Sequence, residues 1–153
     1  MDNTDLDRLL RYCFLLFLVG ASGCGDGRIK TYPTTGTVLV NGKPAEGATV
    51  IYCPVGGSEE FAKERPWDKT DGEGKYELTT FEKGDGAPAG DYTVMIKWTG
   101  PPRAVPDGVD ADRVTGPTDR LKGRYFHPQN SGLTATVEKD RNDIPPFDLE
   151  LRR

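Results

Sequence analysis

The amino-acid sequence predicts an all-β fold, an antiparallel β-sandwich of about seven strands. Three observations lead to this prediction. Several segments alternate apolar and polar residues with a period of two, which is typical of half-buried strands. Turn-forming residues separate these segments, and the 19 glycines and 12 prolines among 153 residues argue against a helical bundle. After residue 30, no ten-residue window carries the apolar stripe of a helix.

Six strands are expected, and the longest has the clearest alternation. Its even-numbered residues from Tyr92 to Trp98 share one apolar face, so we expect Trp98 to lie in the core. The first two strands are apolar on both faces, which is typical of central strands. The nearest candidate for a helix is the segment 119–125, with one or two turns. The six expected strands are 37–40, 48–53, 75–78, 91–98, 133–137 and 147–151.

The turns between these strands have a recognisable chemistry. Asn41-Gly42 is the strongest short hairpin signal, because both residues tolerate a positive φ. Asp71-Gly72-Glu73-Gly74 and Ala89-Gly90-Asp91 mark further reversals of the chain. Short strands joined by such tight turns favour an antiparallel arrangement.

The first 23 residues predict a signal peptide that is absent from the mature protein. Arg8 and Arg11 precede the apolar run 12–19, and the small residues 20–23 separate that run from Cys24. The run is far shorter than the roughly 20 apolar residues that a membrane-spanning helix needs. We therefore interpret it as the core of an export signal. A helix buried in the fold, and ordinary secretion with cleavage nearby, are the alternatives.

Ala21-Ser22-Gly23-Cys24 resembles the lipobox of bacterial lipoproteins, although Ala21 stands where leucine is usual. The resemblance implies that Cys24 is acylated and becomes the mature N-terminus. Its acyl chains would then anchor the protein to a membrane, on the periplasmic or surface side of the cell envelope. On this interpretation residues 24–33 are a short tether, and residues 34–153 form the sandwich.

Three further motifs follow one another along the chain. The first spans 36–50 and contains Asn41-Gly42-Lys43-Pro44, and the second, 70–78, is a turn that leads into a strand. The third, 88–94, is a proline-glycine turn that feeds the longest strand. Together they resemble the transthyretin-like domain of the carboxypeptidase regulatory type, and the tail is similar to that of bacterial lipoproteins built on this module. The resemblance implies a transthyretin-like (prealbumin-like) β-sandwich.

Charge and spacing argue against binding of nucleic acid or metal. The net charge is −4, with 20 basic and 24 acidic residues, which gives no reason to expect a nucleic-acid partner. One acidic stretch contains Asp107, Asp110 and Asp112, and another is Asp71-Gly72-Glu73. Neither has the ligand spacing of a calcium loop, so solvated loop charge is the preferred interpretation. No metal or other cofactor is expected.

Cys53 and His127 are the remaining candidates for chemistry. Cys53 is the one cysteine left once the signal and the lipid site are set aside, so no internal disulfide is expected. A single cysteine on an apolar strand favours packing over a catalytic thiol, for which His127 would be the only base. His127 is interpreted as structural, because no Gly-x-Ser-x-Gly motif accompanies it. The protein is therefore not expected to be an enzyme.

The segment 100–131 is the predicted binding site, because loops of this length are usually functional or disordered. It contains a basic and aromatic cluster, and cations beside aromatic rings suit sugars, peptides or anionic polymers. The alternative is that the two aromatic residues pin the loop onto the edge of the sandwich. The candidate binding residues are Arg120, Lys122, Arg124, Tyr125 and Phe126.

The irregular stretch 54–69 contains Phe61 and Trp67 and allows the same two interpretations. Two classes of function remain. The first is a membrane-anchored, non-catalytic module of the cell envelope that makes protein or glycan contacts. The alternative is an accessory subunit needed for the assembly of an envelope enzyme or transporter complex.

Overall fold

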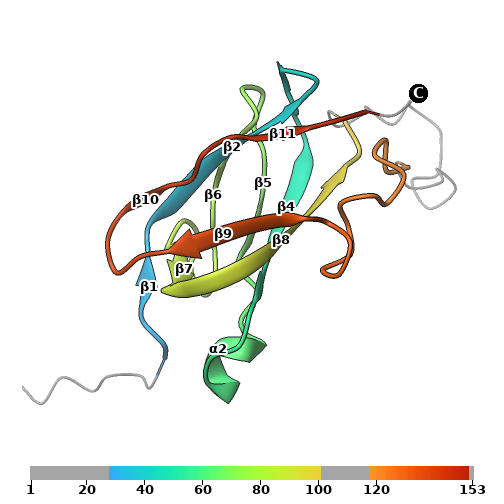
Figure 1. The fold of residues 1–153 in the computed structure, drawn as a ribbon. Helices are drawn as coiled ribbons and strands as arrows, with labels where there is room; N and C mark the ends of the chain where they lie inside the picture. The colour runs from blue at the N-terminus through green and yellow to red at the C-terminus, as the bar shows by residue number, and fades with distance from the viewer. Residues whose placement is uncertain (1–27, 101–117, 152–153) are drawn as a thin grey trace, which may run out of the picture.

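A computed structural model describes residues 28–100 and 118–151, whose fold is almost entirely β (Figure 1). This part of the chain holds eleven strand segments and one short helix, α2 (Glu59–Lys63). The prediction of an all-β fold is confirmed. The number of segments exceeds the expected one because four of them are only two residues long: β1 (Thr31–Tyr32), β3 (Lys43–Pro44), β7 (Ala87–Pro88) and β10 (Asn142–Asp143). The longer strands are β2 (Thr34–Val40), β4 (Ala48–Pro54), β5 (Trp67–Lys69), β6 (Lys75–Glu77), β8 (Gly90–Trp98), β9 (Leu133–Val137) and β11 (Phe147–Leu149).

Two sheets contribute to one core. The first holds four antiparallel strands in the order β5-β4-β8-β9. The second is built around β2, which pairs with β3, β6, β10 and β11. Alternate residues of β2 and β4 are buried, as the period of two requires. The largest fully buried side chains come from both sheets and include Tyr52, Tyr92, Leu78, Ile96, Leu149, Val38, Val50, Val94 and Val137.

The six strands expected from the alternation all form. The largest difference in bounds is at β2, which begins at Thr34 instead of residue 37. Trp98 packs against the core cluster, as expected, but is only half-buried. Its indole Nε1 donates a hydrogen bond to the carbonyl of Glu46 (2.9 Å). The polar end of the ring therefore has a partner at the edge of the core.

The expectation of a purely antiparallel sandwich does not hold at β2. Both β10 and β11 run parallel to this strand, with Asn142 opposite Thr34 and Phe147 opposite Val38. Parallel pairing requires a long crossover, and the strands of the four-stranded sheet lie between β2 and β11 in the sequence. Alternation indicates which face a residue occupies and carries no information on strand direction.

Three segments differ locally from the expectations. Sheet pairing already begins at Thr31 in β1, inside the segment 24–33 that was expected to be a tether, because β1 pairs with β7. The stretch 54–69 contains α2 and β5 instead of being irregular. The five residues of α2 are too few for an apolar stripe, and the Ser58 hydroxyl caps the helix by accepting from the N–H of Phe61 (3.2 Å). The segment 119–125 forms consecutive turns instead of a helix.

The first two motifs of the resemblance meet at one corner of the fold. The Thr70 hydroxyl donates a hydrogen bond to the carbonyl of Ala45 (2.5 Å) and accepts one from the N–H of Ala48 (2.8 Å). Between them Gly47 has a φ of 74°, and its N–H donates to the carbonyl of Thr70 (3.1 Å). These motif residues therefore fix the turn that leads into β4.

Strand β5 links the two sheets. On one side Trp67 lies opposite Ile51 of β4. On the other side the N–H and the carbonyl of Trp67 both form hydrogen bonds with Thr79 (3.0 Å each), just beyond the end of β6. The backbone at Trp67 is thus held by neighbours on both sides.

Candidate functional site

The predicted binding residues lie in the segment 118–131, which follows consecutive turns beside the end of β8 (Figure 1). The carboxylate of Asp119 organises its start. One oxygen, Oδ1, accepts from the N–H groups of Trp98 (3.1 Å) and Leu121 (3.0 Å), and Oδ2 accepts from that of Gly123 (2.8 Å). Asp119 therefore ties the segment to β8 through backbone groups.

Two buried side chains anchor the segment. Leu121 and Tyr125 both belong to the core cluster. The Tyr125 carbonyl accepts from the N–H of Ile96 (2.9 Å), and its hydroxyl accepts from the N–H of Glu150 (3.3 Å). Tyr125 holds the segment against the sandwich, which is what the pinning interpretation expects of this residue.

Three cations at this end of the molecule lie over aromatic rings. Each ring face attracts a positive charge through its quadrupole, which at an exposed site contributes about 0.5–1 kcal/mol. The orientation of these cations is therefore partly fixed before any ligand arrives. The pairs, with the distance from the charged group to the ring centroid, are Arg120 over Trp98 (4.1 Å), Arg124 over Tyr125 (5.1 Å) and Lys97 over Phe126 (5.7 Å).

The structure brings four of the five predicted residues into these pairs. The fifth, Lys122, is exposed and has a φ of 56°. Arg124 also forms an ion pair with Glu150 (3.6 Å). Lys97 and Trp98 are site residues that the sequence reasoning assigned only to a strand. Their position at the end of β8, near the start of the long loop in sequence, is the signal that could have identified them.

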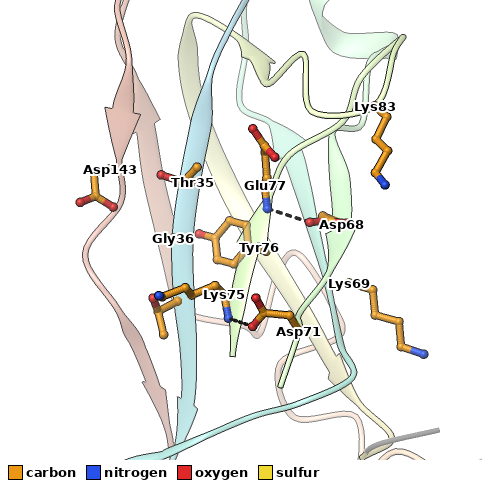
Figure 2. Close-up of a pocket in the computed structure, with 11 residues that line it drawn as sticks. Thr35, Gly36, Asp68, Lys69, Asp71, Lys75, Tyr76, Glu77, Lys83 and Asp143 are labelled. Carbon is orange, nitrogen blue, oxygen red and sulfur yellow. Dashed lines mark hydrogen bonds between the residues drawn. The ribbon is translucent and has the colours of Figure 1, made fainter. Parts of the chain in front are cut away.

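A second candidate is an open depression on the face of β2 and β6 that points away from the core (Figure 2). It has a volume of about 690 Å³ and a lining of mixed charge. The Asp68 carboxylate accepts from the N–H of Glu77 (2.7 Å), so part of this charge serves the backbone. In the described residues no buried side-chain nitrogen or oxygen lacks a hydrogen-bond partner, so none points into the depression unsatisfied. The charged lining residues are Asp68, Lys69, Asp71, Lys75, Glu77, Lys83 and Asp143.

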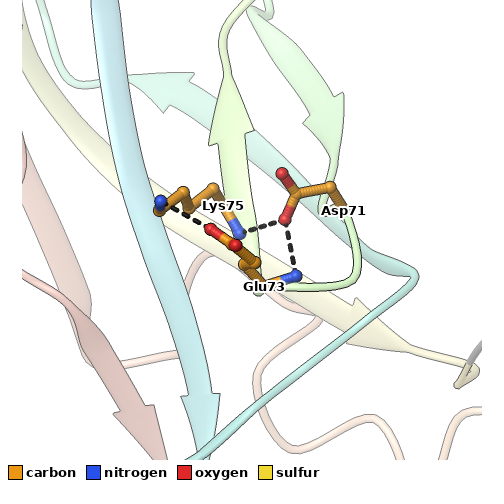
Figure 3. Close-up of polar contacts among 3 residues, drawn as sticks. All are labelled: Asp71, Glu73 and Lys75. Carbon is orange, nitrogen blue, oxygen red and sulfur yellow. Dashed lines mark hydrogen bonds and ion pairs between the residues drawn. The ribbon is translucent and has the colours of Figure 1, made fainter.

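The acidic turn at Asp71-Gly72-Glu73 stabilises its own backbone (Figure 3). Asp71 Oδ1 accepts from the N–H groups of Glu73 and Lys75 (2.9 Å each). The ammonium of Lys75 contacts Glu73 Oε2 (2.6 Å), and this hydrogen bond raises the pKa of Lys75. Both carboxylates therefore already have partners within the turn.

Three tyrosines contact one another inside the sandwich. The hydroxyls of Tyr52 and Tyr76 are 3.0 Å apart, and that of Tyr92 donates to the carbonyl of Pro88 (2.6 Å). Burial raises the pKa of all three, in the case of Tyr76 to about 12. The hydroxyls thus stay protonated at neutral pH and serve packing and hydrogen bonding.

Cys53 and His127 occupy separate environments. Cys53 is buried on β4, and burial raises the pKa of its thiol although the charge of Arg65 opposes the rise. A protonated, buried thiol is a poor nucleophile. His127 is exposed in the segment 118–131, where its ring approaches that of Phe126 (centroids 6.5 Å apart). These observations support the packing interpretation of Cys53.

Four predictions concern residues outside the described ones. These are the signal peptide 1–23, the lipidation site Cys24, the part 101–117 of the expected binding loop, and the acidic stretch of Asp107, Asp110 and Asp112 within it. Within residues 28–100 and 118–151, no three ligating side chains gather where they could hold a metal ion. The same ranges contain no helix of the length and apolarity needed to cross a membrane.

Comparison with other proteins identifies no family for this chain. No protein-family model and no curated protein sequence matches the chain. The function must therefore be inferred from the residues and contacts of the chain itself.

Proposed function

We propose that the protein is a lipid-anchored, non-catalytic binding module of the cell envelope, built on a transthyretin-like sandwich. Its binding site for an anionic partner consists of the segment 118–131 and the end of β8. The observation that carries this proposal is the gathering of three cation–aromatic pairs at that one place. A cation that lies over an aromatic ring keeps its positive charge, so the side of the cation that faces away from the ring can still attract an anionic ligand.

Preorganisation is the physical advantage of this arrangement. Ordering a free arginine side chain costs up to about 2 kcal/mol of conformational entropy. The rings of Trp98 and Tyr125 already restrict Arg120 and Arg124, so a ligand that meets these guanidinium groups loses less free energy on binding. A guanidinium also presents a planar fork of donors that matches carboxylate, sulfate or phosphate groups.

The distribution of charge is consistent with an anionic ligand. Arg124 is paired with Glu150, whereas Arg120 and Lys122 form no ion pair within the described residues. Asp119, the acidic residue next to Arg120 in sequence, directs its carboxylate to backbone N–H groups. The cations are therefore largely uncompensated at this end of the sandwich.

The anchor and the fold family are supported by sequence motifs. Ser22-Gly23-Cys24 follows a short apolar run, which is the pattern of a lipoprotein signal. The motifs at 36–50 and 70–78 occur in the order of a transthyretin-like domain, and Thr70 joins them through its hydroxyl. Intact mass of the protein extracted from membranes tests the anchor. A lipid on an N-terminal Cys24 is expected, and an unmodified N-terminus or unchanged membrane partitioning of Cys24→Ser would contradict it.

The binding site is tested with the full-length protein, using dextran sulfate as an anionic probe and dextran as the neutral control. The combined Arg120→Ala, Lys122→Ala and Arg124→Ala variant should bind dextran sulfate about tenfold more weakly, with a flatter salt dependence. A matched variant removes the same charge elsewhere, at the exposed residues Lys43, Lys139 and Arg141, and should bind as the parent does. Equal losses in the two variants would mean that net charge alone acts, and would refute the site.

Co-purification from native membranes separates the two classes of function. A binding module should release its partner when the three basic residues of the segment are replaced. One defined larger complex that stays bound to this variant would instead favour the accessory-subunit alternative. Melting temperatures of parent and variants should differ little, because exposed charges contribute little to stability.

A further inference from the structure

The outer face of the four-stranded sheet presents one exposed aromatic ring. Trp67 in β5 is 53% exposed, although large aromatic rings are among the side chains whose burial stabilises a fold most. The backbone of Trp67 is nevertheless fixed, since it bonds to Thr79 on one side and lies opposite Ile51 on the other. Trp67 therefore offers a ring on a rigid strand, which positions a side chain more accurately than a loop does.

The residues beside Trp67 in the neighbouring strands do not extend its ring into a broad apolar patch. Ile51, beside it, is half-buried, and Met95 in the next strand is 7% exposed. A stable protein interface buries about 800 Å² on each partner around an apolar centre. Within the described residues the exposed large apolar side chains are Val55, Trp67 and Leu151. A single projecting ring suits a small flat apolar surface better than it suits a protein interface.

Two residues further along the strands, the same face of the sheet carries positive charge. Thr49 of β4 lies opposite Lys69 of β5 on one side and opposite Lys97 of β8 on the other. Since adjacent strands lie about 4.8 Å apart, the two lysine backbones are separated by about 10 Å. Neither lysine forms an ion pair within the part of the chain that the structure describes, and the ammonium of Lys97 lies over the ring of Phe126 (5.7 Å from the centroid). A ligand on this face therefore meets an aromatic ring, a hydroxyl and two cations.

Sugar rings match this combination. The face of a pyranose ring carries polarised C–H groups, which pack on the negative face of an indole, while its hydroxyls and acid groups point outward from the rim. We propose that this face binds an acidic polysaccharide, with one sugar stacked on Trp67 and acid groups of the chain on Lys69 and Lys97. The inference rests on the proposed function for the role of a binding module, and it adds a class of ligand and a surface that shares Lys97 with the site at 118–131.

The test uses the full-length protein and polygalacturonate as the probe, with dextran as the neutral glycan and poly-L-glutamate as the acidic polypeptide. Trp67→Ala should weaken polygalacturonate binding by about tenfold. Its matched control is Val55→Ala, at an apolar residue of similar exposure (55%) outside the face, and this variant should bind as the parent does. Lys69→Ala should weaken binding and flatten the salt dependence, whereas Lys63→Ala on α2 should not.

Fluorescence gives a measurement of stacking that is independent of affinity. The chain has two tryptophans, so polygalacturonate should protect a fraction of the parent fluorescence from acrylamide, and this fraction should be missing in Trp67→Phe. Absence of polygalacturonate binding, unchanged binding by Trp67→Ala, or equal binding of poly-L-glutamate would each overturn the inference. Dextran sulfate binding that depends on Arg120, Lys122 and Arg124 would leave the proposed function intact in all three cases.

Discussion

Thr70→Val should destabilise the protein by about 2–4 kcal/mol. The Thr70 hydroxyl is the hydrogen-bond partner of the Ala45 carbonyl (2.5 Å) and of the Ala48 N–H (2.8 Å). Ala45 and Ala48 are fully buried, so water does not replace the hydroxyl unless the corner opens. A buried group left without its partner costs about 1–3 kcal/mol. Valine has nearly the shape of threonine, so the loss reports the two hydrogen bonds and not a cavity.

Urea unfolding of the full-length protein measures this change. Thr70→Val should lower the urea midpoint at an unchanged m-value, because the surface exposed on unfolding stays the same. Thr70→Ser is the matched control, since it keeps the hydroxyl and loses one methyl group at a cost of about 1 kcal/mol. The reasoning is refuted if Thr70→Val is as stable as Thr70→Ser.

Three further predictions concern the core. The pKa of Tyr76 is raised to about 12, so its neutral form contributes stability that is complete below pH 10 and is lost as the pH rises towards 12. The urea midpoint of the parent should therefore fall more steeply between pH 10 and pH 12 than the midpoint of Tyr76→Phe. Phe61→Ala removes the buried ring that contacts Tyr92 and should cost about 3 kcal/mol in urea unfolding, whereas the exposed Ala62→Ser should change little. Trp98→Ala should cost about 2–3 kcal/mol, less than full burial would give, and a midpoint equal to that of the parent would contradict its packing on the core.

Strands were predictable from the sequence wherever alternation runs for several residues. In the segment 133–137 apolar and threonine residues alternate, and β9 has these bounds. The direction of the strands was not predictable, because a residue keeps its face whether its neighbour runs parallel or antiparallel. The parallel pairs of β2 with β10 and β11 depend on how the chain returns from the other sheet.

The site was predictable only in part, for a related reason. Arg120, Lys122 and Arg124 stand close to Tyr125 and Phe126 in the sequence, so their cluster was visible. The partners supplied by β8 became visible only once the fold placed the end of that strand beside the segment. The role of Trp67, in binding or in packing, was ambiguous for the same reason. A three-residue strand has no period of its own, and only its pairing with β4 directs the ring to the outer face.

The proposed anchor and the proposed binding site are compatible in space. Seven residues lead from Cys24 to Thr31, the first residue of β1, and an extended chain of that length reaches about 25 Å. In the fold β1 lies at one end of the sandwich and the segment 118–131 at the other (Figure 1). A lipid on Cys24 would therefore hold the β1 end close to the membrane and direct the cation–aromatic pairs away from it. The negative potential of anionic lipids is largely screened beyond the Debye length, which is about 8 Å at physiological ionic strength, and the far end of the sandwich would lie beyond that range. The cations would then remain available to a soluble or surface-attached polyanion.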